Sequence, residues 1–110
     1  MKLFAWLSLT LMLAVGAGAA RAHEWFDPWC CNLSDCRPIP DHAVKVTPQG
    51  YVITLQPHEH QMLKNETGPR TYTVPFANAR ISLDPEQRFF ACIWPTPATM
   101  RCFYAKPQGS

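Results

Sequence analysis

The 110-residue sequence lacks the local signatures of common hydrolases and redox enzymes. It has no Gly-x-Ser-x-Gly elbow to position a nucleophilic serine and no Cys-x-x-Cys motif. Outside residues 56–70, no pair of acidic residues lies in an apolar run, where burial would raise a carboxyl pKa for acid catalysis. The sequence also has no internal repeat, low-complexity tract or sign of a second domain. The lack of catalytic motifs favours a non-catalytic protein.

The sequence has no apolar run of the roughly 20 residues needed to span a bilayer. Its apolar stretch, residues 3–15, follows a positive start at Lys2 and precedes small residues. This order is typical of a secretory signal peptide, which we predict to be residues 1–22, with Ala17-Gly18-Ala19 as an alternative cleavage motif. No cysteine ends the run to carry a lipid. We therefore expect a periplasmic or secreted product without a membrane span.

The chain has little net charge once this segment is removed. The whole sequence carries a formal charge of +2, and residues 1–22 contain the positive charges of Lys2 and Arg21. The predicted mature chain, residues 23–110, is therefore formally neutral and long enough for one small domain. Its neutrality removes the electrostatic basis for binding nucleic acid.

The five cysteines all lie in the predicted mature chain, at Cys30, Cys31, Cys36, Cys92 and Cys102. A domain of fewer than about 100 residues in an oxidising compartment commonly uses disulfides, because its core alone is marginal. The spacing does not match the two close pairs of a four-thiolate zinc site. Five thiols form at most two intramolecular bonds, which leaves one thiol over.

Two arrangements of these bonds remain open from the sequence. If residues 89–94 and 101–104 form a hairpin with Ile93 opposite Arg101, then Cys92 lies opposite Cys102 at a distance that a disulfide tolerates. Alternatively, both strand cysteines bond to the cluster at residues 30–36. That arrangement closes longer loops and stabilises the chain more.

The residue patterns predict a mostly β domain of two hairpins plus an edge strand, with an irregular aromatic N-terminal arm. Residues 43–47 and 51–55 are rich in β-branched residues and flank Pro48-Gln49-Gly50, which predicts the first hairpin; residues 89–104 predict the second. Residues 71–76 form a short strand that Pro75 places at an edge. Residues 37–40 are expected to be extended, and the polar residues 56–70 to form a surface loop.

Copper is the alternative cofactor that the sequence suggests. Cleavage before His23 would give this residue a free amine, which together with its imidazole could chelate one copper ion. His42, His58 or His60 would complete the nitrogen set. His58 and His60, two residues apart, would also share one face if extended and could bridge a metal ion. The polar surroundings of this pair favour an ordinary solvated loop instead.

The aromatic arm contains Trp25, Phe26 and Trp29. Exposed rings would offer a platform for a glycan or protein partner, since aromatic side chains give a large contact area. A small domain needs its rings for the core, however, and the adjacent cysteines would hold the arm against the sheet. We therefore favour packing of these rings into the core.

Both ends of the mature chain resemble a group of uncharacterised small exported alphaproteobacterial proteins. The resemblance lies in His23-Glu24-Trp25-Phe26, in Cys30-Cys31, in Asp35-Cys36-Arg37-Pro38 and in the closing Arg101-Cys102-Phe103-Tyr104. The group begins with His-x-Trp-Tyr and carries Cys-Cys and Asp-Cys-x-Pro signatures. Phe90 stands where the group often has His, so a metal role for that His does not transfer. The resemblance implies export and a cysteine framework, but no activity.

The sequence thus predicts an exported accessory domain that binds an unidentified protein or envelope component. The alternative is a copper-binding protein that uses His23.

Overall fold

The computed structural model describes residues 25–32 and 34–107, so the predicted signal peptide and His23 lie outside it. Within the described residues the strands are β1 (Cys36–Ile39), β2 (Val44–Thr47), β3 (Gly50–Leu55), β4 (Arg70–Val74), β5 (Arg80–Ile81), β6 (Phe89–Ile93) and β7 (Met100–Ala105). Short 3-10 turns connect them: η2 (Asp41–Ala43), η3 (Pro57–Glu59), η4 (Gln61–Leu63) and η5 (Phe76–Asn78). In this part of the chain no helix has the length and apolar composition to cross a bilayer. The prediction of a mostly β, disulfide-stabilised domain is confirmed.

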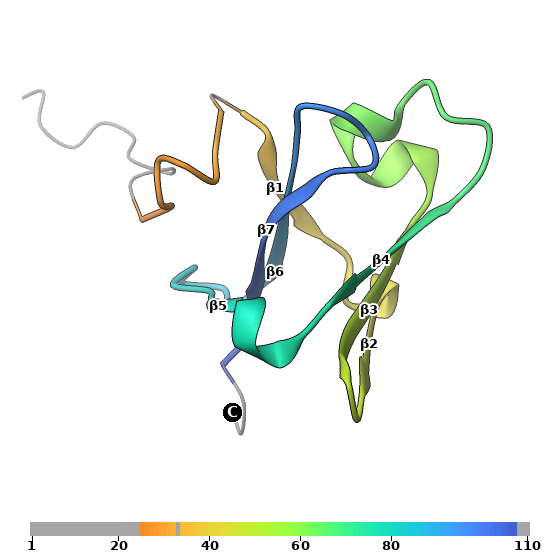
Figure 1. Cartoon of the computed structure of the whole chain (residues 1–110). Coiled ribbons are helices and arrows are strands. Elements are labelled where there is room, and N and C mark those ends of the chain that lie inside the picture. Colours follow the sequence, from red (N-terminus) through yellow and green to blue (C-terminus); the bar gives the residue numbers. More distant parts are fainter. Residues whose placement is uncertain (1–24, 33, 108–110) are drawn as a thin grey trace, which may run out of the picture.

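The strands form two sheets (Figure 1). One is an antiparallel sheet in the order β2-β3-β4, and the other has the order β1-β6-β7-β5, with β5 parallel to β7. Side chains alternate between the faces of a strand, so β6 directs Ala91 and Ile93 to one face and Phe90 and Cys92 to the other. The first face packs against the three-stranded sheet around Phe103, which forms the main core.

Both predicted hairpins are present, as β2–β3 and β6–β7, and β4 is the expected edge strand. Cys92 lies opposite Cys102, as predicted. The expected pairing of Ile93 with Arg101 is wrong, because an irregularity after Cys92 places Ile93 opposite Met100.

The sequence did not predict strands β1 and β5. β1 contains Pro38, which cannot donate a backbone hydrogen bond to a sheet. A proline is nevertheless tolerated in β1, because this strand lies at the edge of its sheet and pairs only with β6. β5 has two residues and makes only the pairs Arg80–Tyr104 and Ile81–Ala105, too few for a sequence pattern.

The second face of the four-stranded sheet carries three cysteines in one row. Cys36 on β1 lies opposite Cys92 on β6, and Cys92 lies opposite Cys102 on β7. Cys92 bonds to Cys36, and Cys102 bonds to Cys30 in the N-terminal arm. The arrangement with both strand cysteines bonded to the N-terminal cluster is therefore correct, and the Cys92–Cys102 bond is not formed.

Gly50 adopts a backbone conformation that residues with a side chain rarely reach, with φ of +142°. A Cβ atom at this position would lie 2.5 Å from the Val74 carbonyl oxygen and 2.9 Å from Pro75 Cα. We expect Gly50→Ala to lower the free energy of unfolding by about 2 kcal/mol, measured by urea denaturation. Gly68→Ala is the matched control, because a Cβ there meets nothing within 4 Å. Equal effects of the two substitutions would contradict this prediction.

Candidate functional site

The N-terminal arm, residues 25–32, is held against the second face of the four-stranded sheet. The Cys30–Cys102 disulfide joins it to β7 with the two Cα atoms 5.5 Å apart. The Asp27 amide also donates a hydrogen bond of 3.0 Å to the Tyr104 hydroxyl. Figure 1 shows the arm on the side of this sheet away from strands β2, β3 and β4. Covalent and polar contacts thus fix a segment that has no strand pairing of its own.

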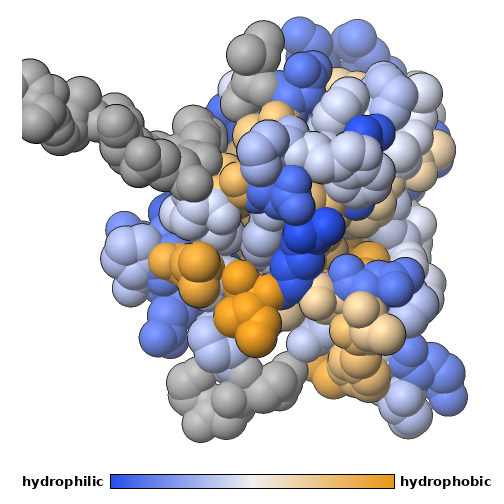
Figure 2. Space-filling view, turned by 60° about the vertical axis from the view of Figure 1, so that its left-hand side comes forward, coloured by the Kyte–Doolittle hydropathy of each residue, from blue (hydrophilic) through white to orange (hydrophobic). Residues whose placement is uncertain are grey.

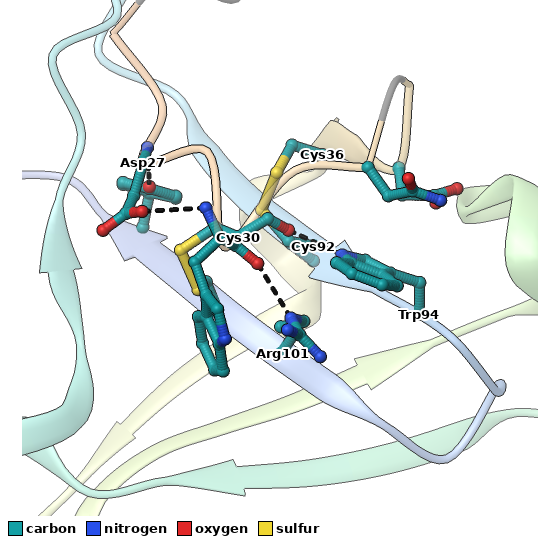
Figure 3. Close-up of a disulfide and its surroundings, with 12 residues drawn as sticks. Asp27, Cys30, Cys36, Cys92, Trp94 and Arg101 are labelled. Atoms are coloured by element: carbon teal, nitrogen blue, oxygen red, sulfur yellow. Dashed lines mark hydrogen bonds between the residues drawn. A yellow bond between two sulfur atoms is a disulfide. The ribbon is translucent and has the colours of Figure 1, made fainter.

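The attached arm encloses the Arg101 guanidinium between two indole rings. Its central carbon lies 3.9 Å from the ring centre of Trp29 and 4.0 Å from that of Trp94. Arg101 Nε donates to the Trp29 carbonyl at 2.8 Å, and Trp94 Nε1 donates to the Cys30 carbonyl at 2.7 Å. Figure 3 shows Arg101 and Trp94 beside Cys30. Cation–π contact and these bonds restrict the side-chain orientation of Arg101.

Arg101 is a cation without a carboxylate partner among the described residues, since no ion pair in this part of the chain includes it. The neighbouring Arg80 pairs with Asp27 at 3.1 Å, and about two fifths of each side chain is exposed. Such a hydrated pair contributes little stability, and it exchanges readily with other anions. The area around the arm therefore has local positive charge.

A groove of about 480 Å³ lies beside this arginine, between β7 and the segment from β4 through η5. Its lining combines two guanidinium groups, one indole, and hydroxyl and amide side chains. These side chains belong to Trp29, Thr73, Asn78, Arg80 and Arg101. The arrangement can bind an anion and a flat ring at the same time.

The three aromatic residues of the arm lie in different environments. Phe26 is buried, and the half-buried Trp25 makes edge-on contacts with Phe90 and Tyr104. The expected packing into the core is therefore found for Trp25 and Phe26. It is wrong for Trp29, which is 56% exposed because its ring covers Arg101 instead of entering the sheet.

His60 is buried, so the expectation of a solvated loop is wrong at this position. The Met62 amide donates to His60 Nδ1 at 3.1 Å, which leaves Nε2 to carry the ring proton. Nε2 lies 3.1 Å from the Asp35 carbonyl oxygen and 3.0 Å from that of Ala91, and it donates to both. Burial lowers the pKa of His60, although the two carbonyls act in the opposite direction.

These contacts leave His60 no nitrogen for a metal ion unless its hydrogen bonds break. His58 is solvent-exposed, and His42 Nε2 lies 3.0 Å from Glu59 Oε2. In residues 25–32 and 34–107, no group of three or more His, Cys, Asp or Glu residues is arranged to hold a metal. The copper site suggested for His23 remains a prediction, since that residue lies outside the described part.

Cys31 is the fifth cysteine, and its sulfur belongs to neither disulfide. It is half-buried beside the aromatic cluster on the second face of the four-stranded sheet. The vicinal pair is therefore divided, because Cys30 is joined to β7 and Cys31 belongs to neither of the two disulfides.

Sequence reasoning missed Arg101, Trp94 and Arg80 as site residues. Arg101 and Trp94 lie on either side of the turn of one hairpin, and Trp29 comes from a distant segment. The Cys30–Cys102 bond holds Trp29 of the N-terminal arm beside Arg101 and Trp94. Predicting this site from the sequence would therefore have required the pairing of Cys30 with Cys102.

A second groove, of about 450 Å³, is more apolar. It is lined in part by the exposed side chains of Val46, Phe76 and Ile81. Figure 2 shows apolar side chains next to strongly hydrophilic ones on the surface. Its two cations, Arg80 and Lys106, are paired with Asp27 and Asp41.

In comparisons with known proteins, no protein-family model matches the sequence, and no curated protein or solved structure gives a significant match.

Proposed function

We propose that this chain is an exported, non-catalytic domain that binds a component of the cell envelope, in the periplasm or after secretion. The groove beside Arg101 carries the proposal. Two indoles and a disulfide-bonded arm hold this cation in place, and Trp29 remains exposed beside it. An oriented guanidinium that has no carboxylate partner in the described part of the chain and lies next to an exposed ring is suited to recognition.

Export is supported by the N-terminal segment and by the two disulfides, which are typical of proteins in oxidising compartments. The resemblance to exported alphaproteobacterial proteins agrees with this part of the proposal. N-terminal mass analysis of the protein from cells tests it. We expect a chain that begins at His23, contains two disulfides and is absent from the cytoplasm. Uncleaved cytoplasmic protein would contradict export.

Binding is favoured over catalysis because the described groups with perturbed pKa values have structural partners. The Arg88 guanidinium donates two hydrogen bonds to the Asp84 carboxylate and thereby lowers the pKa of Asp84. His60 is bonded to backbone groups through both nitrogens. Burial raises the pKa of Tyr72 to about 12, and its hydroxyl donates to the Pro97 carbonyl. The hydrogen bonds of these groups therefore stabilise the fold.

Retention of envelope material by the immobilised, oxidised protein tests the binding function. We expect a defined component to be retained by the native protein and its retention to fall at least about fivefold in Trp29→Ala, because a hot-spot ring supplies much of the contact energy. Phe76→Ala is the matched control, since Phe76 is also an exposed aromatic residue but lines the other groove. Equal retention by native protein, Trp29→Ala and reduced, alkylated protein would contradict the proposal.

A further inference from the structure

The groove beside Arg101 points to a chemical class of ligand. Building on the proposed binding function, we propose that it binds an acidic saccharide, with a uronate carboxylate on Arg101 and a sugar ring against Trp29.

The carboxylate site follows from the hydrogen-bonding capacity of Arg101. A guanidinium has five N–H donors, and Arg101 uses its Nε donor on the Trp29 carbonyl. Its terminal nitrogens have no hydrogen-bond partner among the described residues, while both faces of the group are covered by indoles. The open edge of this planar group therefore suits two parallel bonds to a carboxylate.

Arg80 supplies a second positive group in the same groove. Its contact with Asp27 is a single exposed ion pair of 3.1 Å, which is weakly stabilising. A second carboxylate of an oligosaccharide can replace or share this contact. Because the predicted mature chain is formally neutral, the attraction is local to the groove and is not that of a generally basic surface.

The surroundings of the two arginines favour a saccharide over an acidic peptide. Arg101 covers one face of the Trp29 ring, and with 56% of the residue exposed the other face remains open to solvent. Thr73 and Asn78 supply hydroxyl and amide groups along the same groove. An open indole face with polar neighbours fits a flat ring that has C–H groups on its face and hydroxyls at its edge.

Calorimetric titration of the purified, oxidised protein at low ionic strength tests this assignment. The probes are trigalacturonate, its fully methyl-esterified form and triglutamate. We expect trigalacturonate to bind at least about tenfold more tightly than the other two, because the ester removes the charge-assisted bonds and the peptide lacks the sugar rings.

Substitutions locate the binding. Arg101→Gln should weaken trigalacturonate binding at least about tenfold and Arg80→Gln about threefold. Arg37→Gln, an equal charge change at an exposed position of β1, should leave the binding unchanged. Disulfide content and circular dichroism establish that each variant is folded. Arg80→Gln leaves the Arg101 stack in place, so it tests the groove even if Arg101→Gln does not fold.

The acidic-saccharide assignment would be overturned by any of four results. Trigalacturonate does not bind, its ester binds equally well, triglutamate binds as tightly or more tightly, or Arg37→Gln loses as much affinity as Arg101→Gln. If envelope material is still retained in a Trp29-dependent manner, the ligand class is wrong while the binding function stands. If neither is observed, both proposals fail.

Discussion

Replacing Cys30 and Cys102 together by alanine, with the Cys36–Cys92 bond intact, is expected to lower the free energy of unfolding by about 3 kcal/mol. In the unfolded chain the Cys36–Cys92 bond brings residues 36 and 92 together. The Cys30–Cys102 bond therefore closes a loop of only about 17 residues through that cross-link, instead of one that spans its sequence separation of 72. Closing a loop of this length lowers the conformational entropy of the unfolded chain and so stabilises the folded state by about 3 kcal/mol. Urea denaturation followed by tryptophan fluorescence measures the change.

The same reasoning sets the cost of removing both disulfides. The first bond closed in the unfolded chain spans 72 or 56 residues and contributes about 4 kcal/mol, and the second adds about 3 kcal/mol. The total of about 7 kcal/mol is comparable to the whole stability of a domain of this size. We therefore expect the chain without both bonds to be largely unfolded.

Alanine is the suitable replacement because all four bonded cysteines are buried and serine would add a buried hydroxyl at each site. Cys31→Ala keeps both disulfides and is the matched control. A loss in Cys31→Ala as large as that in the Cys30/Cys102 double variant would show that sulfur packing, and not cross-linking, supplies the stability.

His60→Ala is expected to lower the free energy of unfolding by about 3 kcal/mol. The imidazole satisfies the Asp35 and Ala91 carbonyls and the Met62 amide, and its removal leaves these groups unpaired near the core. Each unsatisfied buried group costs about 1–3 kcal/mol, part of which water entering the space recovers. The exposed His58→Ala is the matched control and should change stability by less than about 0.5 kcal/mol.

The same residue predicts how stability depends on pH. Burial lowers the pKa of His60 in the folded protein from its ordinary value of 6.5, so the unfolded chain takes up this proton at a higher pH. The His60 contribution is therefore complete above about pH 6.5 and decreases as the pH falls towards the folded-state pKa. His60→Ala should show a shallower loss of stability between about pH 7 and 5 than His58→Ala. Parallel curves would contradict the burial of a neutral His60.

The strands that the sequence predicted are those with a strong local pattern. Residues 51–55 and 89–93 are rich in β-branched and aromatic side chains, and these segments form β3 and β6. β1 was missed because Pro38 argues against a strand unless the edge position is known. The position of β1 next to β6 also decided the disulfides, because it places Cys36 opposite Cys92. A hairpin considered alone offers Cys92 only one partner, Cys102.

The candidate site was less predictable because its parts are distant in the sequence. Trp29 and Arg101 are separated by 72 residues and meet only when the arm is bonded to β7. His60 was assigned to a solvated loop from its polar neighbours, yet the carbonyls that bury it belong to other segments. Local polarity reports the neighbours in sequence, whereas burial depends on the neighbours in space.

Equilibrium unfolding of the reduced protein, with its thiols alkylated, tests most directly whether the two disulfides hold this fold together. We expect no cooperative transition in urea and a tryptophan emission spectrum typical of solvent-exposed indoles from the start of the titration. A cooperative transition with a midpoint close to that of the oxidised protein would contradict the account.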